Sequence, residues 1–141
     1  MRKILLDTDV ILDFLFDRAP FANSAAEILA MCESKEIKGY LTAVIISNLY
    51  YLLRQTATHG KVIEKLSKLI SITEILVTDK KMVIRALKSE FKDFEDALQN
   101  YTAELDGHID LIVTRNTKDF KQSKLPVMTP DHYLRSLNSI S

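Results

Sequence analysis

The sequence predicts an α/β fold in which a parallel sheet is covered by helices on both faces. Short apolar runs that end abruptly in polar residues alternate along the chain with segments of helical periodicity. Such runs are typical of buried parallel strands, and the alternation requires crossover connections that place helices over the sheet. With only three glycines and three prolines, the loops should be short. A length of 141 residues suits one domain, residues 1–141, with one hydrophobic core.

Five segments are predicted to be strands. The first, residues 3–6, is apolar and ends in Asp7-Thr8-Asp9, and the run at 109–114 ends in Arg115-Asn116-Thr117. Shorter candidates lie at residues 39–42, 74–78 and 126–129. In parallel sheets, sites form beyond the carboxyl ends of the strands. The polar residues that follow these runs are therefore the first place to look for function.

Helical patterns fill the intervals between these strands. Residues 22–34 and 61–70 carry apolar side chains at helical spacing, and residues 44–56 are so apolar that we expect them to be largely buried. Two more helices are predicted at residues 80–91 and 93–105. A last helix should open at Thr129-Pro130, because threonine can cap a helix and proline fits its first position.

Composition excludes several functional classes. The 19 basic and 19 acidic residues balance, so no long-range positive field would attract nucleic acid and any polyanion contact must be local. Cys32 is the only cysteine, which excludes an internal disulfide framework and a cysteine-based zinc cluster. No apolar run approaches the roughly 20 residues that span a bilayer, and Asp7 interrupts the N-terminal run too early for a signal peptide. We expect a cytoplasmic protein that does not enter a membrane.

Three polar clusters stand out, and each has a structural explanation by itself. Thr8 or Asp9 can cap the helix after the first strand, and acids in a first helical turn are favoured by the helix dipole by about 0.3–1 kcal/mol each. Asn116 can cap a short helix, and Asp119 can pair with a lysine. The clusters are Asp7, Asp9 and Asp13; Asp93, Glu95 and Asp96; and Thr114, Asn116 and Asp119.

The three clusters are more informative together, because the predicted sheet would bring them to one place. Carboxylates are the ligands of hard cations such as Mg²⁺ and Mn²⁺, and several acids in one place repel each other unless a cation is present. A metal bound there could activate water and stabilise the leaving oxygen in phosphodiester hydrolysis. The residues thus indicate a metal-dependent phosphodiester hydrolase.

Four segments, in this order, resemble the PIN domain family: LLDTDVILD at 5–13, TAVIISNLYYLL at 42–53, DFEDAL at 93–98 and IVTRNTKDF at 112–120. The resemblance implies a three-layer α/β/α sandwich with a central parallel sheet of four to five strands. It also implies a Mg²⁺- or Mn²⁺-dependent nuclease that usually acts on RNA, and frequent formation of a homodimer. Small stand-alone bacterial members are often VapC-type toxins, so a cognate antitoxin is a further expected partner.

The resemblance assigns roles to individual residues. Asp7, Asp96 and Asp119 match the metal-binding acids of the family and, with Asn116, form the expected catalytic set. Arg115 and Lys118 flank these residues and are expected to contact phosphate. The accessory positions are Thr8, Asp9, Asn48, Asp93 and Thr114.

Asn48 departs from the family pattern, which usually has a glutamate at this point. An asparagine can coordinate through its carbonyl oxygen, but it brings no charge and cannot act as a base. We expect a weaker metal affinity, and we hypothesise that Asp93 or Glu95 supplies the missing carboxylate. The alternative is a PIN fold that has lost its chemistry and serves as a binding module.

Two other phosphoryl-transfer folds are weaker alternatives. A response-regulator receiver also has acids after its first strand and an aspartate, here Asp79, after its third. It would need a lysine after the fifth strand, where residues 127–130 have none. Phosphatases of the haloacid-dehalogenase type use an aspartate like Asp7 as a nucleophile, but they usually need a longer chain.

Overall fold

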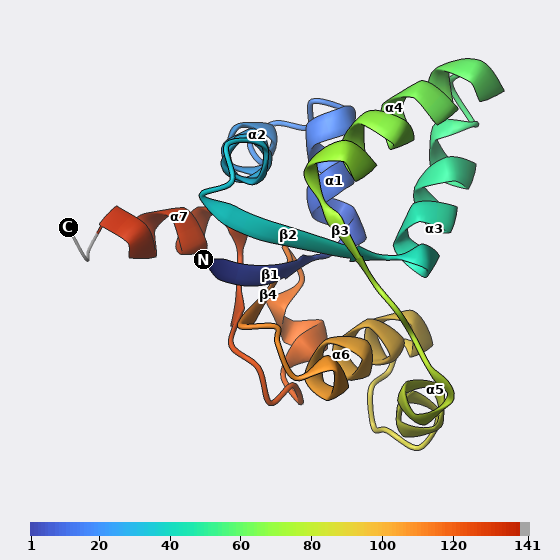
Figure 1. The fold of residues 1–141 in the computed structure, drawn as a ribbon, viewed down its shortest axis with the longest axis vertical. Coiled ribbons are helices and arrows are strands. Elements are labelled where there is room, and N and C mark those ends of the chain that lie inside the picture. The colour runs from blue at the N-terminus through green and yellow to red at the C-terminus, as the bar shows by residue number, and fades with distance from the viewer. Residues whose placement is uncertain (139–141) are drawn as a thin grey trace.

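The computed structural model describes residues 1–138 and is built around one sheet of five parallel strands (Figure 1). The strands pair in the order β3-β2-β1-β4-β5, so the first strand lies in the middle. This arrangement confirms the predicted α/β fold with a central parallel sheet. The strands are β1 (Arg2–Leu6), β2 (Ile37–Thr42), β3 (Glu74–Leu76), β4 (Leu111–Val113) and β5 (Val127–Met128).

Helices cover both faces of the sheet, giving three layers (Figure 1). One face carries α1 (Thr8–Leu15), α2 (Ala22–Glu33), α3 (Ala43–Leu53) and α4 (His59–Ile72). The other face carries α5 (Lys80–Leu87) and α6 (Phe94–Asp106), and a 3-10 turn, η1 (Thr117–Phe120), follows β4. The last helix, α7 (Pro130–Asn138), lies near α2. None of the helices within residues 1–138 combines the length and the apolar character needed to span a bilayer.

The central strands are apolar on both sides because helices cover both sides. Ile4, Leu5 and Leu6 of β1 are completely buried, as are the three residues of β4. Burial on both faces removes the alternation of polar and apolar residues that marks a half-exposed strand. The parallel register pairs Ile4 with Leu111 and Leu6 with Val113, so β1 and β4 end at the same level.

A glycine in β2 allows α2 to approach the sheet closely. A Cβ atom added to Gly39 would lie 2.6 Å from Sγ of Cys32 and 3.2 Å from Cδ1 of Leu6. Real Cβ atoms essentially never show the shorter contact, so a side chain at this position would force Cys32 to shift. Cys32 is a buried core residue with a free thiol.

The predicted elements all occur, with shifted ends. The helix predicted at 61–70 extends over His59–Ile72, because Thr58 caps it by accepting a hydrogen bond from Lys61 N. The helix predicted at 80–91 is shorter and stops at Leu87. Asp7, rather than the expected Thr8 or Asp9, is the residue that caps α1.

Candidate active site

The candidate site lies beside β1, the strand from which the order of the sheet continues in opposite directions. The chain leaves β1 toward β2 on one side, whereas β4 and β5 lie on the other side of β1. Such a switch point opens a crevice beyond the carboxyl ends of the two neighbouring strands. Asp7 follows β1 and Thr114 follows β4, so both residues lie at the bottom of this crevice. Their strands are joined there by a hydrogen bond of 3.0 Å from Asp7 N to Val113 O.

Asp7 is held in place by two donors. Thr8 N donates to its Oδ1 at 2.8 Å, and the Thr114 hydroxyl donates to its Oδ2 at 2.7 Å. The residue is only 6% exposed, and burial raises the pKa of its carboxyl, an effect that these two hydrogen bonds oppose. The negative charges of Asp119 and Asp93 raise the pKa of Asp7 further. Carboxylates more than 80 positions away in the sequence therefore lie near enough to act on Asp7.

The first turn of α6 brings the second acidic cluster to the same edge of the sheet. Asp93 caps the helix by accepting a hydrogen bond of 3.0 Å from Asp96 N. Burial raises the pKa of the half-buried Asp96 to about 7, together with the negative charges of Asp7, Asp93, Asp119 and Glu95. The three acids predicted to bind metal thus belong to one electrostatically coupled group, although they come from three distant segments.

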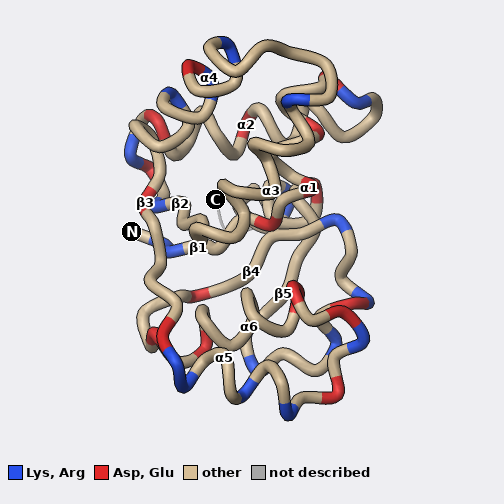
Figure 2. Tube along the Cα trace, turned by 90° about the vertical axis from the view of Figure 1, so that its right-hand side faces the viewer, with Lys and Arg blue, Asp and Glu red and all other residues tan. Residues whose placement is uncertain are grey.

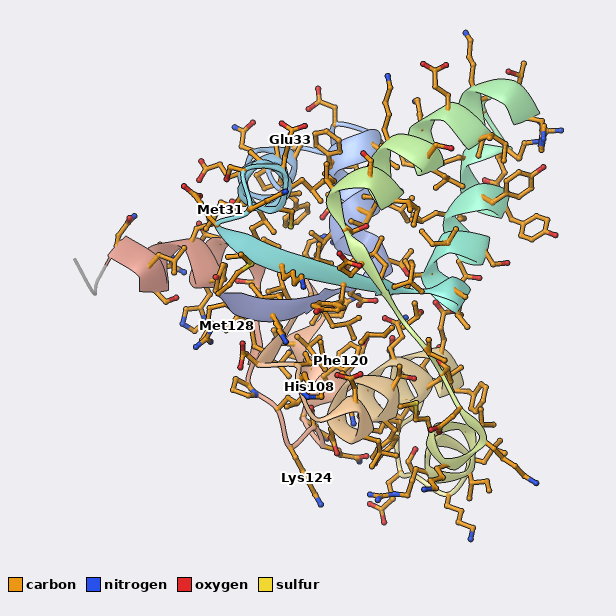
Figure 3. The ribbon with its side chains drawn as sticks, in the orientation of Figure 1. Met31, Glu33, His108, Phe120, Lys124 and Met128 are labelled. Atoms are coloured by element: carbon orange, nitrogen blue, oxygen red, sulfur yellow. The ribbon has the colours of Figure 1, made fainter. Side chains whose placement is uncertain are left out.

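Asp119 reaches the group through the 3-10 turn after β4. Phe120 is 1% exposed and lies between the sheet and α6, where it anchors the turn (Figure 3). Its neighbour Asp119 is exposed and makes no ion pair with a lysine within residues 1–138. Lys124, a little further along the chain, points away from the molecule (Figure 3). The salt bridge that would have given Asp119 a purely structural role is therefore missing.

Asn48 contacts the acidic cluster from the opposite helical layer. Its Nδ2 donates a hydrogen bond to Oε1 of Glu95, joining α3 on one face of the sheet to α6 on the other. Burial raises the pKa of Glu95, the Asn48 hydrogen bond lowers it, and the charges of Asp93 and Asp7 raise it. Glu95 is therefore a member of the group.

The side of the site formed by α1 carries a separate network around Asp9. Its carboxylate accepts hydrogen bonds from Arg115 N at 3.2 Å and from Asn116 Nδ2 at 3.1 Å. Burial and the charge of Asp7 raise the pKa of Asp9 to about 7. Asn116 stands at the cap position of η1 without making a side-chain cap bond, because its amide is directed to Asp9.

Arg115 forms an ion pair that the sequence analysis missed. Its Nε and Nη2 donate to the two oxygens of Asp13 at 2.6 and 3.0 Å, and its guanidinium lies 4.2 Å from the ring centre of Phe21. Asp13 is completely buried, although it is a charged residue that follows the apolar Val10, Ile11 and Leu12. That isolated charge at a core position was the signal for a buried partner. Contact of Arg115 with phosphate stays a prediction, as does that of the exposed Lys118.

Comparison with known proteins identifies the family. A model of the PIN domain matches residues 3–118, which is most of the chain. The chain belongs to the PIN domain family. No match was found among curated protein sequences.

Solved structures show the same fold for this PIN domain. FitAB bound to an IR36 DNA fragment is 20% identical, with a TM-score of 0.70, covering 92% of this chain and 96% of that one. VapBC2 from Rickettsia felis, bound to a DNA fragment from its promoter, is 19% identical, with a TM-score of 0.66 and coverage of 89% and 96%. A toxin-antitoxin complex from Klebsiella pneumoniae is 24% identical, with a TM-score of 0.65 and coverage of 90% and 97%. Together with the sheet order, these similarities confirm the three-layer α/β/α sandwich.

The residues of this PIN domain fit a divalent cation by their chemistry. As the side chains stand, no three His, Cys, Asp or Glu residues within residues 1–138 are placed to enclose an ion. The group nevertheless concentrates negative charge at one point, and two buried oxygens beside it, Thr8 Oγ1 and Gln99 Oε1, lack a hydrogen-bond partner in the same part of the chain. A hydrated cation would offset the repulsion between the acids and supply donors to such oxygens.

Figure 2 shows lysine and arginine positions interspersed with aspartate and glutamate positions on the side of the molecule that it presents. This mixture agrees with the zero formal net charge of the chain. Attraction of a polyanion would therefore depend on contacts at the site rather than on a long-range field.

Proposed function

We propose that this PIN domain is a Mg²⁺- or Mn²⁺-dependent endoribonuclease of the kind found in VapC-type toxins. The observation that carries the proposal is the coupling of Asp7, Asp96 and Asp119 at the switch point of the sheet. PIN domains are generally nucleases, and hard cations bound by carboxylates serve phosphodiester hydrolysis in many folds. The similar solved structures are PIN proteins from toxin-antitoxin systems, which favours the same class for this chain.

In this mechanism, Asp7, Asp96 and Asp119 would hold the metal. When bound there, the metal would polarise a water molecule and offset the negative charge that develops on the phosphate. Thr8 N and the Thr114 hydroxyl orient the carboxylate of Asp7.

Asn116 fixes Asp9 through its amide, and this bond keeps the loop after β4 close to α1. Lys118 is exposed next to Asp119, and in this proposal it contacts a phosphate of the substrate. No side chain has to act as a nucleophile. Direct attack by water on the phosphorus leaves a 5′-phosphate and a 3′-hydroxyl on the products.

Cleavage of a labelled RNA with Mn²⁺ tests this proposal. Asp7→Asn and Asp96→Asn should each lower the cleavage rate by about 100-fold or more, because each removes a charge needed for metal binding and catalysis. Glu90→Gln removes an exposed carboxylate shortly before α6 and should leave the rate unchanged. Cleavage that survives both aspartate substitutions, or products that end in a 2′,3′-cyclic phosphate, would overturn the mechanism.

A PIN fold without catalytic activity is the second candidate. It is favoured by Asn48 and by the lack of three ready-placed metal ligands within residues 1–138. Calorimetric titration of the whole chain with Mn²⁺ separates the two candidates. Saturable binding that is lost in Asp96→Asn supports the nuclease, whereas a folded protein that does not bind Mn²⁺ would be a binding module.

An antitoxin-like protein is the proposed partner, by similarity to the toxin-antitoxin complexes. A groove between α1, α2 and α4 fits this role, since Phe14, Leu29 and Ile72 are among its mainly apolar lining residues. Lys65, Lys68 and Glu33 also line it, and Lys68 pairs with Glu64, so a helix with an apolar face and both acidic and basic flanking residues would be complementary. Phe14→Asp should abolish complex formation with such a partner and leave RNA cleavage intact. Unchanged complex formation would exclude this groove.

A further inference from the structure

The contact between Asn48 and Glu95 links the two helical layers directly over the end of the sheet. Asn48 belongs to α3 and Glu95 to the first turn of α6, and their side chains are hydrogen-bonded although 47 positions separate them in the sequence. The asparagine can only donate through Nδ2, so the bond fixes Oε1 of Glu95 as the acceptor and leaves Oε2 uncommitted. A glutamate in place of Asn48 would repel Glu95.

Glu95 is held among other carboxylates rather than in solvent. The side chain is partly buried and lies near the like charges of Asp93 and Asp7. A glutamate in the first turn of a helix could instead point into solvent, where it would keep its favourable interaction with the helix dipole. The amide of Asn48 holds it in the acidic group nevertheless.

Gln99 provides a second observation at the same place. Its side chain is 1% exposed, its Nε2 lies 3.5 Å from Oε1 of Glu95, and its own Oε1 has no hydrogen-bond partner within residues 1–138. Buried carbonyl oxygens are rarely left unsatisfied. An unpaired oxygen beside a carboxylate is an environment that a cation or its bound water completes.

We propose that Glu95 is a carboxylate ligand of the divalent ion in the proposed active site, and that Asn48 is a positioning residue that orients it. The inference rests on the proposed function. The helix α3 has the neutral Asn48 at the position where a carboxylate is expected, and Glu95 of α6 supplies the missing negative charge. The site then has four carboxylates: Asp7, Glu95, Asp96 and Asp119.

Mn²⁺ affinity, measured by calorimetry on the whole chain, tests the proposal. Glu95→Gln keeps the shape of the side chain and an oxygen that can accept from Asn48, so the fold should persist while the affinity falls by about tenfold or more. Asn48→Ala should weaken Mn²⁺ binding by about tenfold, because it frees Glu95 without removing a charge. Glu90→Gln, which removes an exposed charge outside the site, should bind Mn²⁺ like the wild type.

Moving the carboxylate provides the decisive variant. In the double variant Asn48→Glu/Glu95→Gln, α3 supplies the charge and α6 supplies the amide, and the Mn²⁺ affinity should return to within about threefold of wild type, less than 1 kcal/mol. If Glu95→Gln binds Mn²⁺ as the wild type does while Asp96→Asn does not, Glu95 is no ligand and the nuclease proposal still stands. If the wild-type chain does not bind Mn²⁺, both proposals fail.

Discussion

The ion pair between the buried Asp13 and the partly exposed Arg115 gives a quantitative prediction about stability. In Arg115→Ala, both hydrogen bonds to Asp13, of 2.6 and 3.0 Å, disappear, and a carboxylate whose side chain is 1% exposed loses its main partner. Removing one member of a buried pair typically costs about 3–5 kcal/mol. Arg18 remains 3.7 Å from Asp13, but its side chain is 43% exposed, so it compensates weakly. We expect a loss of about 3 kcal/mol.

Urea unfolding followed by circular dichroism measures this change. For a domain of this size, about 3 kcal/mol corresponds to a fall in Tm of about 9 °C. Arg115→Lys keeps the charge but loses the two-pronged contact, so its loss should be intermediate. Lys118→Ala, three positions along the same loop, removes an exposed charge and should change the free energy of unfolding by no more than about 0.5 kcal/mol.

A second variant separates the penalty of an unpaired charge from simple loss of contacts. Replacing both partners with apolar residues, as in Asp13→Leu/Arg115→Met, should restore much of the stability that Arg115→Ala loses. The explanation would be refuted if Arg115→Ala cost less than about 1 kcal/mol, or if the double variant were less stable than Arg115→Ala.

Two further predictions concern pH and packing. The pKa values of Asp9 and Asp96 are raised to about 7 from 3.8, so the folded chain binds more protons than the unfolded chain between these values. The contribution of these groups to the free energy of unfolding is therefore full below about pH 4 and is lost as pH rises toward 7. The double variant Asp9→Asn/Asp96→Asn should show a smaller loss of stability between pH 5 and pH 7, measured by urea unfolding at both pH values. Gly39→Ala should destabilise the fold by about 1–3 kcal/mol through the contact with Cys32. Cys32→Ala in the same chain should recover part of that loss, and no recovery in Tm would show that the strain lies elsewhere.

The fold was largely predictable because its signals are local. The apolar runs at β1 and β4 have no polar alternation, since helices bury both sides of these strands. Thr129 and Pro130 marked the start of the last helix through their own backbone preferences. Ends of elements were less predictable, because a single cap such as Thr58 lengthens a helix without changing its apolar pattern.

The sequence by itself determined which residue types are available for chemistry: acids and amides after two strands and in the first turn of one helix. It also determined the class of fold that brings these residues to one edge of the sheet. An apolar strand buried on both faces and followed by polar residues is recognisable from a few consecutive positions. Only the tertiary structure decided how these side chains pair. Asp13 turned out to be bound to Arg115, Asn116 to Asp9, and Asn48 to Glu95. Such pairings join positions 47 to 107 residues apart. They depend on the register of β1 with β4 and on the placement of α3 and α6 on opposite faces of the sheet, which no local pattern records.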